Sequence, residues 1–369
     1  MLKSLWTDLL DPKDPLMAVR QKHWDLFEAI GLPRPKQEAF QYLSKKFHFP
    51  PLAEKKRGSA AADLVFIDGF FQDARLPAPL VCSPLDGAIR SYGLFLQARL
   101  AKLIKEETDP FAALNGAFQG RGAFLYIPPK CKAALHLAQI FTGGGMASPR
   151  LHVYLGRGSE LRLTQVSEGK SGFCNELFDF VLDEGARLSF IDHAGGDLQA
   201  IRAMLKKDSY LKTVSLGQHT RVSMKVQLAE ENSEAQLYGL ARLYGETESH
   251  VHATVEHASP HTRSRQHFKT VLQDRSRFSF EGKIRVLPAA QKTEAYQLNN
   301  TLILSDGASA NAKPNLEIFA DDVKASHGAT VGQLDEEQLF YFRSRGIDLA
   351  QAKELLTNGF CKEILDHAG

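Results

Sequence analysis

The sequence of 369 residues has only four cysteines, and none of them belongs to a metal-binding motif. Cys82, Cys131, Cys174 and Cys361 lie far apart, and no CxxC or CxxH pair occurs. Zinc knuckles and ferredoxin-type cluster loops need such short spacings, so the sequence encodes neither. We expect four free thiols, most of them buried and inert.

A surplus of charge of either sign is also missing. The chain has 45 Lys and Arg against 43 Asp and Glu, which gives a formal net charge of +2. A charge this small creates no long-range field that would attract nucleic acid or anionic lipid. We therefore expect neither a nucleic acid nor a membrane as a partner.

Long apolar runs are absent as well. No segment is apolar enough to span a bilayer, and the start MLKSLWTDLLDPKDPL lacks the basic head and apolar stretch of a secretory signal. With 43% hydrophobic and 24% charged residues, the composition is that of a folded protein with a substantial core. We predict a cytoplasmic protein.

The first third of the chain has helical periodicity. In HWDLFEAIGLPRP, Trp24, Phe27 and Ile30 recur at helical spacing, and Gly31 followed by Pro33 ends the run. A further apolar stripe follows between residues 84 and 114. The pattern predicts a mainly helical N-terminal domain over residues 1–120.

Over residues 121–330 the pattern changes to short alternating strands separated by turns. Typical units are RLHVYLGRGSELRLTQV and ELFDFVLDEGARLSFIDHA, each with a strand, a small or charged turn and a second strand. Such units recur roughly every 20 to 35 residues, which is typical of a solenoid whose stacked coils share one core. The pattern favours a β-helix over a β-sandwich or jelly roll, which also have many short strands.

Residues 331–369 return to helical periodicity. Asp335 and Asp348 are each placed to cap a helix, and Gly346 can end the first helix in a left-handed conformation. The second helix has an apolar stripe. This stripe either packs against the β domain or docks in a groove of a partner.

Few residues suggest catalytic or metal chemistry. No Walker, dinucleotide-binding or GxSxG motif occurs. His250 and His252 would share one face of a strand and, with His257 or His261, form a candidate metal site. Histidines that are satisfied by neighbouring groups are more common than ligands.

The segment EIFADDVKASHGAT has the densest set of reactive side chains. Asp321, Asp322 and Lys324 could act as calcium ligands and base in a β-helix carbohydrate-active enzyme. Adjacent aspartates on an extended strand point to opposite faces, which argues against one shared ion. His327 is favoured instead, because its imidazole can bind iron or relay a proton, and Gly328 lets another backbone approach closely.

Several segments carry a family resemblance. GKIRVLPAAQKTEAYQLNNTLILSDGA and KPNLEIFADDVKASHGATVGQLDEEQLFYFRSRGI closely resemble the shared C-terminal signature of the SufB and SufD proteins, which assemble iron–sulfur clusters. VEHASPHTRSRQHFKTVLQDRSRFSF, DPFAALNGAF and GLPRPKQEAFQY are similar to the same family. The chain resembles SufD more than SufB, because it is short and reads SHGATVG where SufB proteins typically have a cysteine and an acidic residue.

The resemblance implies a right-handed parallel β-helix between helical ends, in a scaffold that is not an enzyme. It also implies pairing with SufB through the two β-helices, binding of the ATPase SufC by the C-terminal helices, and a part in iron acquisition. Iron or an iron–sulfur cluster would be held only transiently in the complex, with no cofactor stably bound to the isolated chain. Without SufB, a homodimer could form.

Under the resemblance, His327 corresponds to an interface histidine proposed as a ligand of the cluster or of iron. Ala325 stands where many SufD relatives have a cysteine, so sulfur ligands must come from the partner. The candidate SufC-docking residues are Leu339, Phe342, Leu349, Leu355, Leu356 and Phe360. One alternative is a SufB-like homodimeric scaffold, which would need Cys131 or Cys174 to accept a persulfide.

Overall fold

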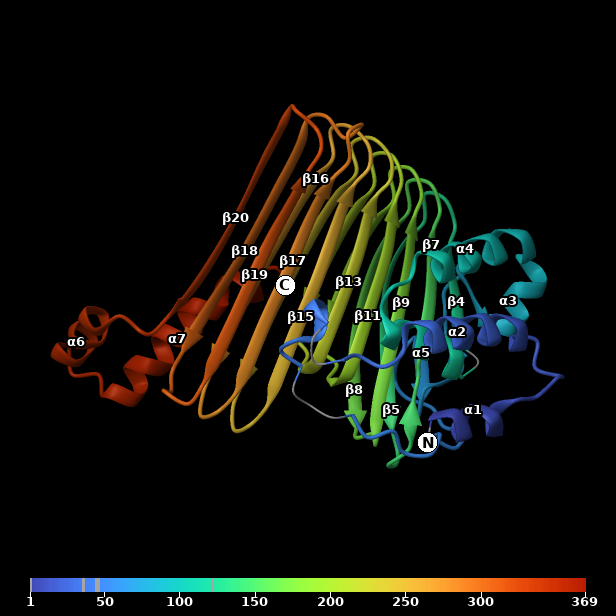
Figure 1. The fold of residues 1–369 in the computed structure, drawn as a ribbon, viewed down its shortest axis with the longest axis horizontal. Helices are drawn as coiled ribbons and strands as arrows, with labels where there is room; N and C mark the ends of the chain where they lie inside the picture. Colours follow the sequence, from blue (N-terminus) through green and yellow to red (C-terminus); the bar gives the residue numbers. More distant parts are fainter. Residues whose placement is uncertain (1, 35–36, 44–46, 121) are drawn as a thin grey trace.

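A computed structural model describes residues 2–34, 37–43, 47–120 and 122–369. The chain forms a long β-solenoid with helices at both ends (Figure 1). The predicted mainly β architecture is confirmed, because consecutive coils pair through parallel strands. A sandwich or jelly roll would have antiparallel sheets instead.

Two long sheets form the walls of the solenoid, and each coil adds one strand to each of them. In spatial order, the first sheet contains β2 (Phe70–Ala74), β1 (Leu64–Ile67), β5 (Lys132–Phe141), β8 (Glu160–Gly169), β10 (Arg187–Asp192), β12 (Tyr210–Ser215), β14 (Glu234–Leu243), β16 (Arg263–Leu272), β18 (Thr293–Ile303) and β20 (Val323–Gly332). The second sheet contains β19 (Ser309–Ile318), β17 (Arg277–Val286), β15 (Glu248–His257), β13 (His219–Leu228), β11 (Gly196–Leu205), β9 (Phe173–Leu182), β7 (Arg150–Leu155), β4 (Ala123–Ile127) and β3 (Val81–Pro84). The short strand β6 (Met146–Ala147) pairs with β9.

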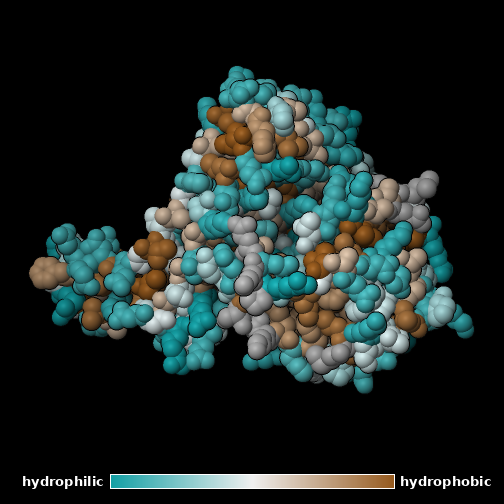
Figure 2. All heavy atoms as spheres, viewed as in Figure 1, coloured by the Kyte–Doolittle hydropathy of each residue, from teal (hydrophilic) through white to brown (hydrophobic). Residues whose placement is uncertain are grey.

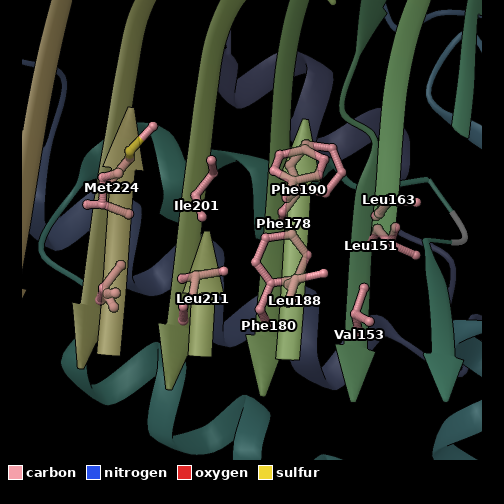
Figure 3. Close-up of a cluster of buried hydrophobic side chains, with 14 of the residues drawn as sticks. Leu151, Val153, Leu163, Phe178, Phe180, Leu188, Phe190, Ile201, Leu211 and Met224 are labelled. Carbon is pink, nitrogen blue, oxygen red and sulfur yellow. The ribbon is translucent and has the colours of Figure 1, made fainter. Parts of the chain in front are cut away.

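Alternate side chains of both sheets meet in the lumen between them and form one continuous core (Figure 3). Phe178 and Phe180 of β9 pack on Phe190 of β10, with ring centroids 4.9 and 5.3 Å apart. Strands have a side-chain period of two, so the alternation in the sequence determines which residues face the lumen. The predicted small or charged turns contain glycines in the left-handed region, such as Gly158 and Gly185.

Helices and one hairpin occupy the N-terminal part of the chain. The helices are α1 (Leu2–Leu9), α2 (Met17–Ile30), the 3-10 helix η1 (Glu38–Phe40), α3 (Leu85–Ser91), α4 (Gly93–Glu106) and α5 (Pro110–Phe118). The hairpin β1–β2 lies within the segment expected to be mainly helical, and β1 pairs with β5, so this hairpin extends the first sheet. The domain boundaries at residues 120 and 330 stay a prediction.

Buried ion pairs join the N-terminal helices to the outer face of the second sheet. Arg99 of α4 pairs with Asp179 of β9. Glu107, which follows α4, accepts hydrogen bonds from Arg202 of β11 at 2.7 and 3.0 Å. These contacts explain why both faces of the central strands are buried.

The C-terminal helices are α6 (Glu336–Ser344) and α7 (Leu349–Leu365). Both predicted caps are confirmed: Asp335 accepts from the backbone N–H of Glu337, and Asp348 accepts from that of Gln351. Helix α7 packs on β14 and β16, whereas α6 projects away from the solenoid (Figure 1). In the described part of the chain, no helix combines the length and the apolarity needed to cross a lipid bilayer.

Candidate functional site

The solenoid is open at its C-terminal end, where β19 and β20 are the last strands of the two sheets. Strand β20 pairs with β18, and β19 pairs with β17. Among the described residues, no strand pairs with their outward edges. An uncovered strand edge presents unpaired N–H and C=O groups and can pair with another chain.

His327 lies at this open end, on the lumen side of β20. The parallel register places it opposite Gln297, which lies opposite Gln266 and then Leu237. Those three side chains are buried, with exposed fractions between 0 and 3%, whereas His327 is exposed. The imidazole is therefore the last member of a lumen column, presented to whatever docks on the open end.

Polar groups line the lumen directly behind His327. Gln297 Nε2 donates to Gln266 Oε1 at 3.0 Å, while Gln297 Oε1 has no hydrogen-bond partner. Gly282 of β17 makes room for this amide, because a Cβ at that position would collide with Gln297 Nε2. A buried acceptor without a partner is costly, so the amide is placed to accept a hydrogen bond at the open end.

The surface around His327 is mostly apolar. Ala325 lies two residues before it on the same face and packs in a cluster with Val323 and Leu316. Ile318 and Val331 are 38 and 48% exposed. Ala325 has no thiol, so His327 is the candidate ligand on this part of β20, and its ligand role stays a prediction.

The six predicted docking residues divide by burial. Leu339 is buried, and Phe360 packs in the cluster that fixes α7 to the solenoid. Phe342 and Leu356 are half-buried, while Leu349 and Leu355 are exposed. Figure 2 shows this end of the molecule projecting from the body, with apolar side chains among hydrophilic ones.

Helix α6 has two exposed aromatic residues that were not among the predicted docking residues. Phe340 of α6 is 72% exposed and Tyr341 is 56% exposed. One side of the apolar stripe on α7 packs on the solenoid, which confirms one of the two alternatives, whereas docking of the exposed side in a partner stays a prediction. An amphipathic pattern alone cannot separate these two sides.

The cysteines are free, as predicted. Cys174 faces the lumen and is 2% exposed, and burial together with nearby carboxylates raises its pKa well above the usual range. Because the thiolate is the nucleophile, this environment disfavours persulfide transfer to Cys174. Cys131 is half-buried in the turn before β5.

His250 and His252 share the outer face of β15, as predicted, but the candidate third ligands His257 and His261 lie elsewhere. His250 bonds Ser279 on the outer face of β15, whereas His257 lies in the lumen between Thr262 and Ser264. His261 is a left-handed turn residue. The structure therefore disperses this predicted candidate metal site over two faces of the sheet and one turn.

The acidic pair proposed for a carbohydrate-active enzyme lies in a turn, not on a strand. Asp321 and Asp322 precede β20, and Asp322 pairs with Lys292. Lys324 pairs with Glu294 on the outer face, at 3.2 Å. These pairings are those of a solvated surface.

A buried polar cluster, formed by Glu176, Asp192 and His219, was missed from the sequence. Burial raises the pKa of Glu176 to about 7. The three residues lie on separate strands, so no short motif indicates them. The available signal was local: Asp192 and Gln165 occupy positions where the alternation of RLSFID and RLTQV predicts apolar lumen residues.

Comparisons with known proteins find sequence similarity to one family over most of the chain. Residues 139–360 match the SufBD core domain of SUF system FeS cluster assembly. An iron–sulfur cluster assembly SufBD family protein of Synechocystis is 30% identical over 398 residues, covering 95% of this chain and 87% of that protein. The chloroplastic protein ABCI7 of Arabidopsis thaliana is 27% identical over 394 residues, covering 95 and 82%. The iron–sulfur cluster assembly protein SufD of Escherichia coli is 40% identical over 146 residues, covering 40 and 34%.

Proposed function

This chain belongs to the SufBD family of iron–sulfur cluster assembly proteins, and we propose that it acts in the cytoplasm as a SufD-type scaffold subunit without enzymatic turnover. In this proposal it pairs with SufB, binds the ATPase SufC and supports iron acquisition. The growing cluster is cargo, shared with SufB and then released. The similarity to SufD of Escherichia coli supports the choice of SufD.

The observation that carries the proposal is the open solenoid end. Its two outward strand edges can extend into the sheets of a second β-helix, and its apolar surface would be buried there. A subunit with the same kind of solenoid, such as SufB, is the partner that this shape fits best. The homodimer expected without SufB would use the same surface.

His327 would then face the partner across the interface. A neutral imidazole is a borderline ligand that suits iron, whereas softer thiolate ligands would have to come from the partner because residue 325 is alanine. Gln297 behind it can orient the ring by a hydrogen bond, as second-shell groups do at metal sites.

The exposed apolar side chains of α6 and α7 would form the SufC-docking surface. We define this surface by Phe340, Tyr341, Leu349 and Leu355, all of which are at least 44% exposed. Because α7 is fixed to β14 and β16 through Cys361 and Ile364, a movement of bound SufC would be transmitted to the solenoid wall.

Co-purification of this chain with SufB and SufC of the same genome tests the proposal. We expect the native chain to capture both proteins. Ala329→Arg places a charge on the lumen side of the exposed strand β20 and should lose SufB but keep SufC. The matched control is Thr330→Arg, because Thr330 is adjacent but faces outward, where it bonds Asn300.

Capture of neither partner by the native chain would refute the scaffold role. The SufB-like alternative predicts instead that the chain alone forms a dimer that holds a cluster. Loss of SufB by both substitutions would mean that a charge on either face of β20 prevents docking, and would contradict the specific role given to the lumen face.

A further inference from the structure

A second polar site lies inside the solenoid, many coils from His327. In β5, β8 and β10, lumen positions after buried leucine or phenylalanine residues are occupied by Gln139, Gln165 and Asp192. In the facing sheet, Glu176 and Gln199 occupy lumen positions of β9 and β11. These side chains are at most 2% exposed, so the apolar core is interrupted by one compact polar cluster.

Three of its atoms have the spacing of metal ligands. His219 Nε2 lies 3.1 Å from Asp192 Oδ2 and 3.7 Å from Glu176 Oε1, and the three atoms all lie within 4.8 Å of one another. Ligands at ~2.1 Å from one ion are separated by ~3.0 Å in octahedral and ~3.4 Å in tetrahedral geometry. The cluster therefore needs only small adjustments to surround an ion.

A side-chain amide fills the centre of this arrangement. Gln199 Nε2 lies 2.6 Å from Glu176 Oε1, 2.8 Å from Asp192 Oδ2 and 3.3 Å from His219 Nε2. The two hydrogens of this nitrogen are donated to the two carboxylates, because His219 Nε2 itself donates to Asp192 Oδ2. Its other end, Gln199 Oε1, is buried without any hydrogen-bond partner. A half-turn of the amide would direct this oxygen to the centre as a fourth ligand.

We propose that Glu176, Asp192, His219 and Gln199 form a binding site for one divalent first-row transition-metal cation. Two carboxylates, one imidazole and one amide oxygen suit a borderline cation, and the carboxylates neutralise its charge in a medium of low dielectric constant. Binding uses the lone pair of neutral His219 Nε2, so the proton that this atom now shares with Asp192 is released.

The surrounding groups hold the ligands in place. Gln139 and Gln165 both donate to Glu176 Oε2, at 2.5 and 2.8 Å, which leaves Oε1 for the ion. The backbone N–H of Ala194 donates to Asp192 Oδ1 and leaves Oδ2 in the same way. His219 Nδ1 has no partner and can carry the remaining proton. The outer contacts thus orient the two carboxylates, Glu176 and Asp192, as such contacts do at metal sites.

A pocket of about 440 Å³ reaches one of the four proposed ligands from the surface. It is lined by His219, Gly196 and Gln218, together with the carboxylates of Glu246 and Glu248. Glu246 is paired with Arg275. The site goes beyond the proposed scaffold role, because it does not involve His327, β20 or the C-terminal helices.

Titration of the metal-free, tag-free full chain with Co²⁺ tests the proposal. We expect one equivalent to bind with visible d–d bands and without a near-ultraviolet sulfur-to-metal band, since no ligand is a thiolate. Asp192→Asn and His219→Gln should each weaken binding by at least about 100-fold. His257→Gln removes another buried lumen imidazole and should leave Co²⁺ binding unchanged.

His327→Ala separates this site from the proposed cluster ligand, because it should also leave Co²⁺ binding unchanged. The proposal is overturned if the folded native chain binds no Co²⁺, or if a thiolate charge-transfer band appears. Binding that persists in both Asp192→Asn and His219→Gln would overturn it too. If these two variants fail to fold, the Co²⁺ spectrum of the native chain is the deciding measurement.

Discussion

His327 of β20 lies directly opposite Gln297 of β18 in the parallel register of the first sheet. The column that they continue passes from Leu237 through Gln266 to Gln297 and is buried until it reaches His327. This column thus changes from an apolar residue to polar ones as it approaches the open end. His327, the proposed metal ligand, therefore lies where a second subunit would close the solenoid.

The exposed side of α7 should carry affinity for SufC but little stability. We expect Leu355→Ser to weaken SufC binding by at least about tenfold, roughly 1.4 kcal/mol, because it removes an apolar contact. Since Leu355 is 50% exposed, the substitution should change the free energy of unfolding of the protein by no more than about 0.5 kcal/mol. Calorimetric titration with SufC and urea unfolding measure the two effects.

Lys353→Ser is the control for this prediction, because Lys353 is exposed on the same helix but polar. It should bind SufC like the native chain. Equal SufC affinity of Leu355→Ser and the native chain would exclude this side of α7 from the docking surface.

The ion pair between α4 and β9 should be essential for stability. Asp179→Asn leaves the Arg99 guanidinium buried without its carboxylate and removes a partner of His152. We expect a loss of about 3 to 5 kcal/mol in the free energy of unfolding, measured by urea denaturation. Glu160→Gln breaks the exposed pair with Lys132 and should cost less than about 1 kcal/mol. Similar losses in both variants would contradict the role given to burial.

Acid should destabilise the fold through buried histidines. Burial lowers the pKa of His257 to about 3, whereas an unfolded histidine titrates near 6.5. Between these values the unfolded state binds the proton and the folded state does not, so stability falls as the pH falls below about 6.5. We expect the titration of His257 to lower the free energy of unfolding by roughly 3 kcal/mol between pH 7 and 4.5.

His257→Gln tests this directly, since glutamine can bond Thr262 and Ser264 but does not titrate. Urea unfolding at both pH values should show a smaller acid-induced loss for this variant. An identical loss in the native chain and the variant would mean that other groups control the acid response.

The solenoid could be predicted from the sequence because its signal is local. Alternation within a strand determines the lumen face, and turns such as that at Gly158 recur at the spacing of one coil. The hairpin β1–β2 was missed although its Asp68–Gly69 turn, with both residues at positive φ, is a typical hairpin signal. Its strands are short and lie among helices, so helical periodicity dominated the interpretation.

Contacts that depend on the register of distant strands could not be predicted from the sequence. Asp192 and His219 meet because coils of particular lengths place β10 and β13 at one corner, and no short spacing encodes that contact. His327 could be proposed as a candidate because its own segment carries a family signature. Its position at the end of a lumen column, however, depends on the pairing of four strands.

The most direct test measures iron and acid-labile sulfide in anaerobically purified complexes of this chain with SufB and SufC. The native chain is compared with His327→Ala and with the control Ser326→Ala, whose side chain lies on the outer face of the same strand. We predict that all three assemble equally and that His327→Ala alone loses cluster content, by at least about tenfold. A His327→Ala complex with the native content of iron and sulfide would contradict the account.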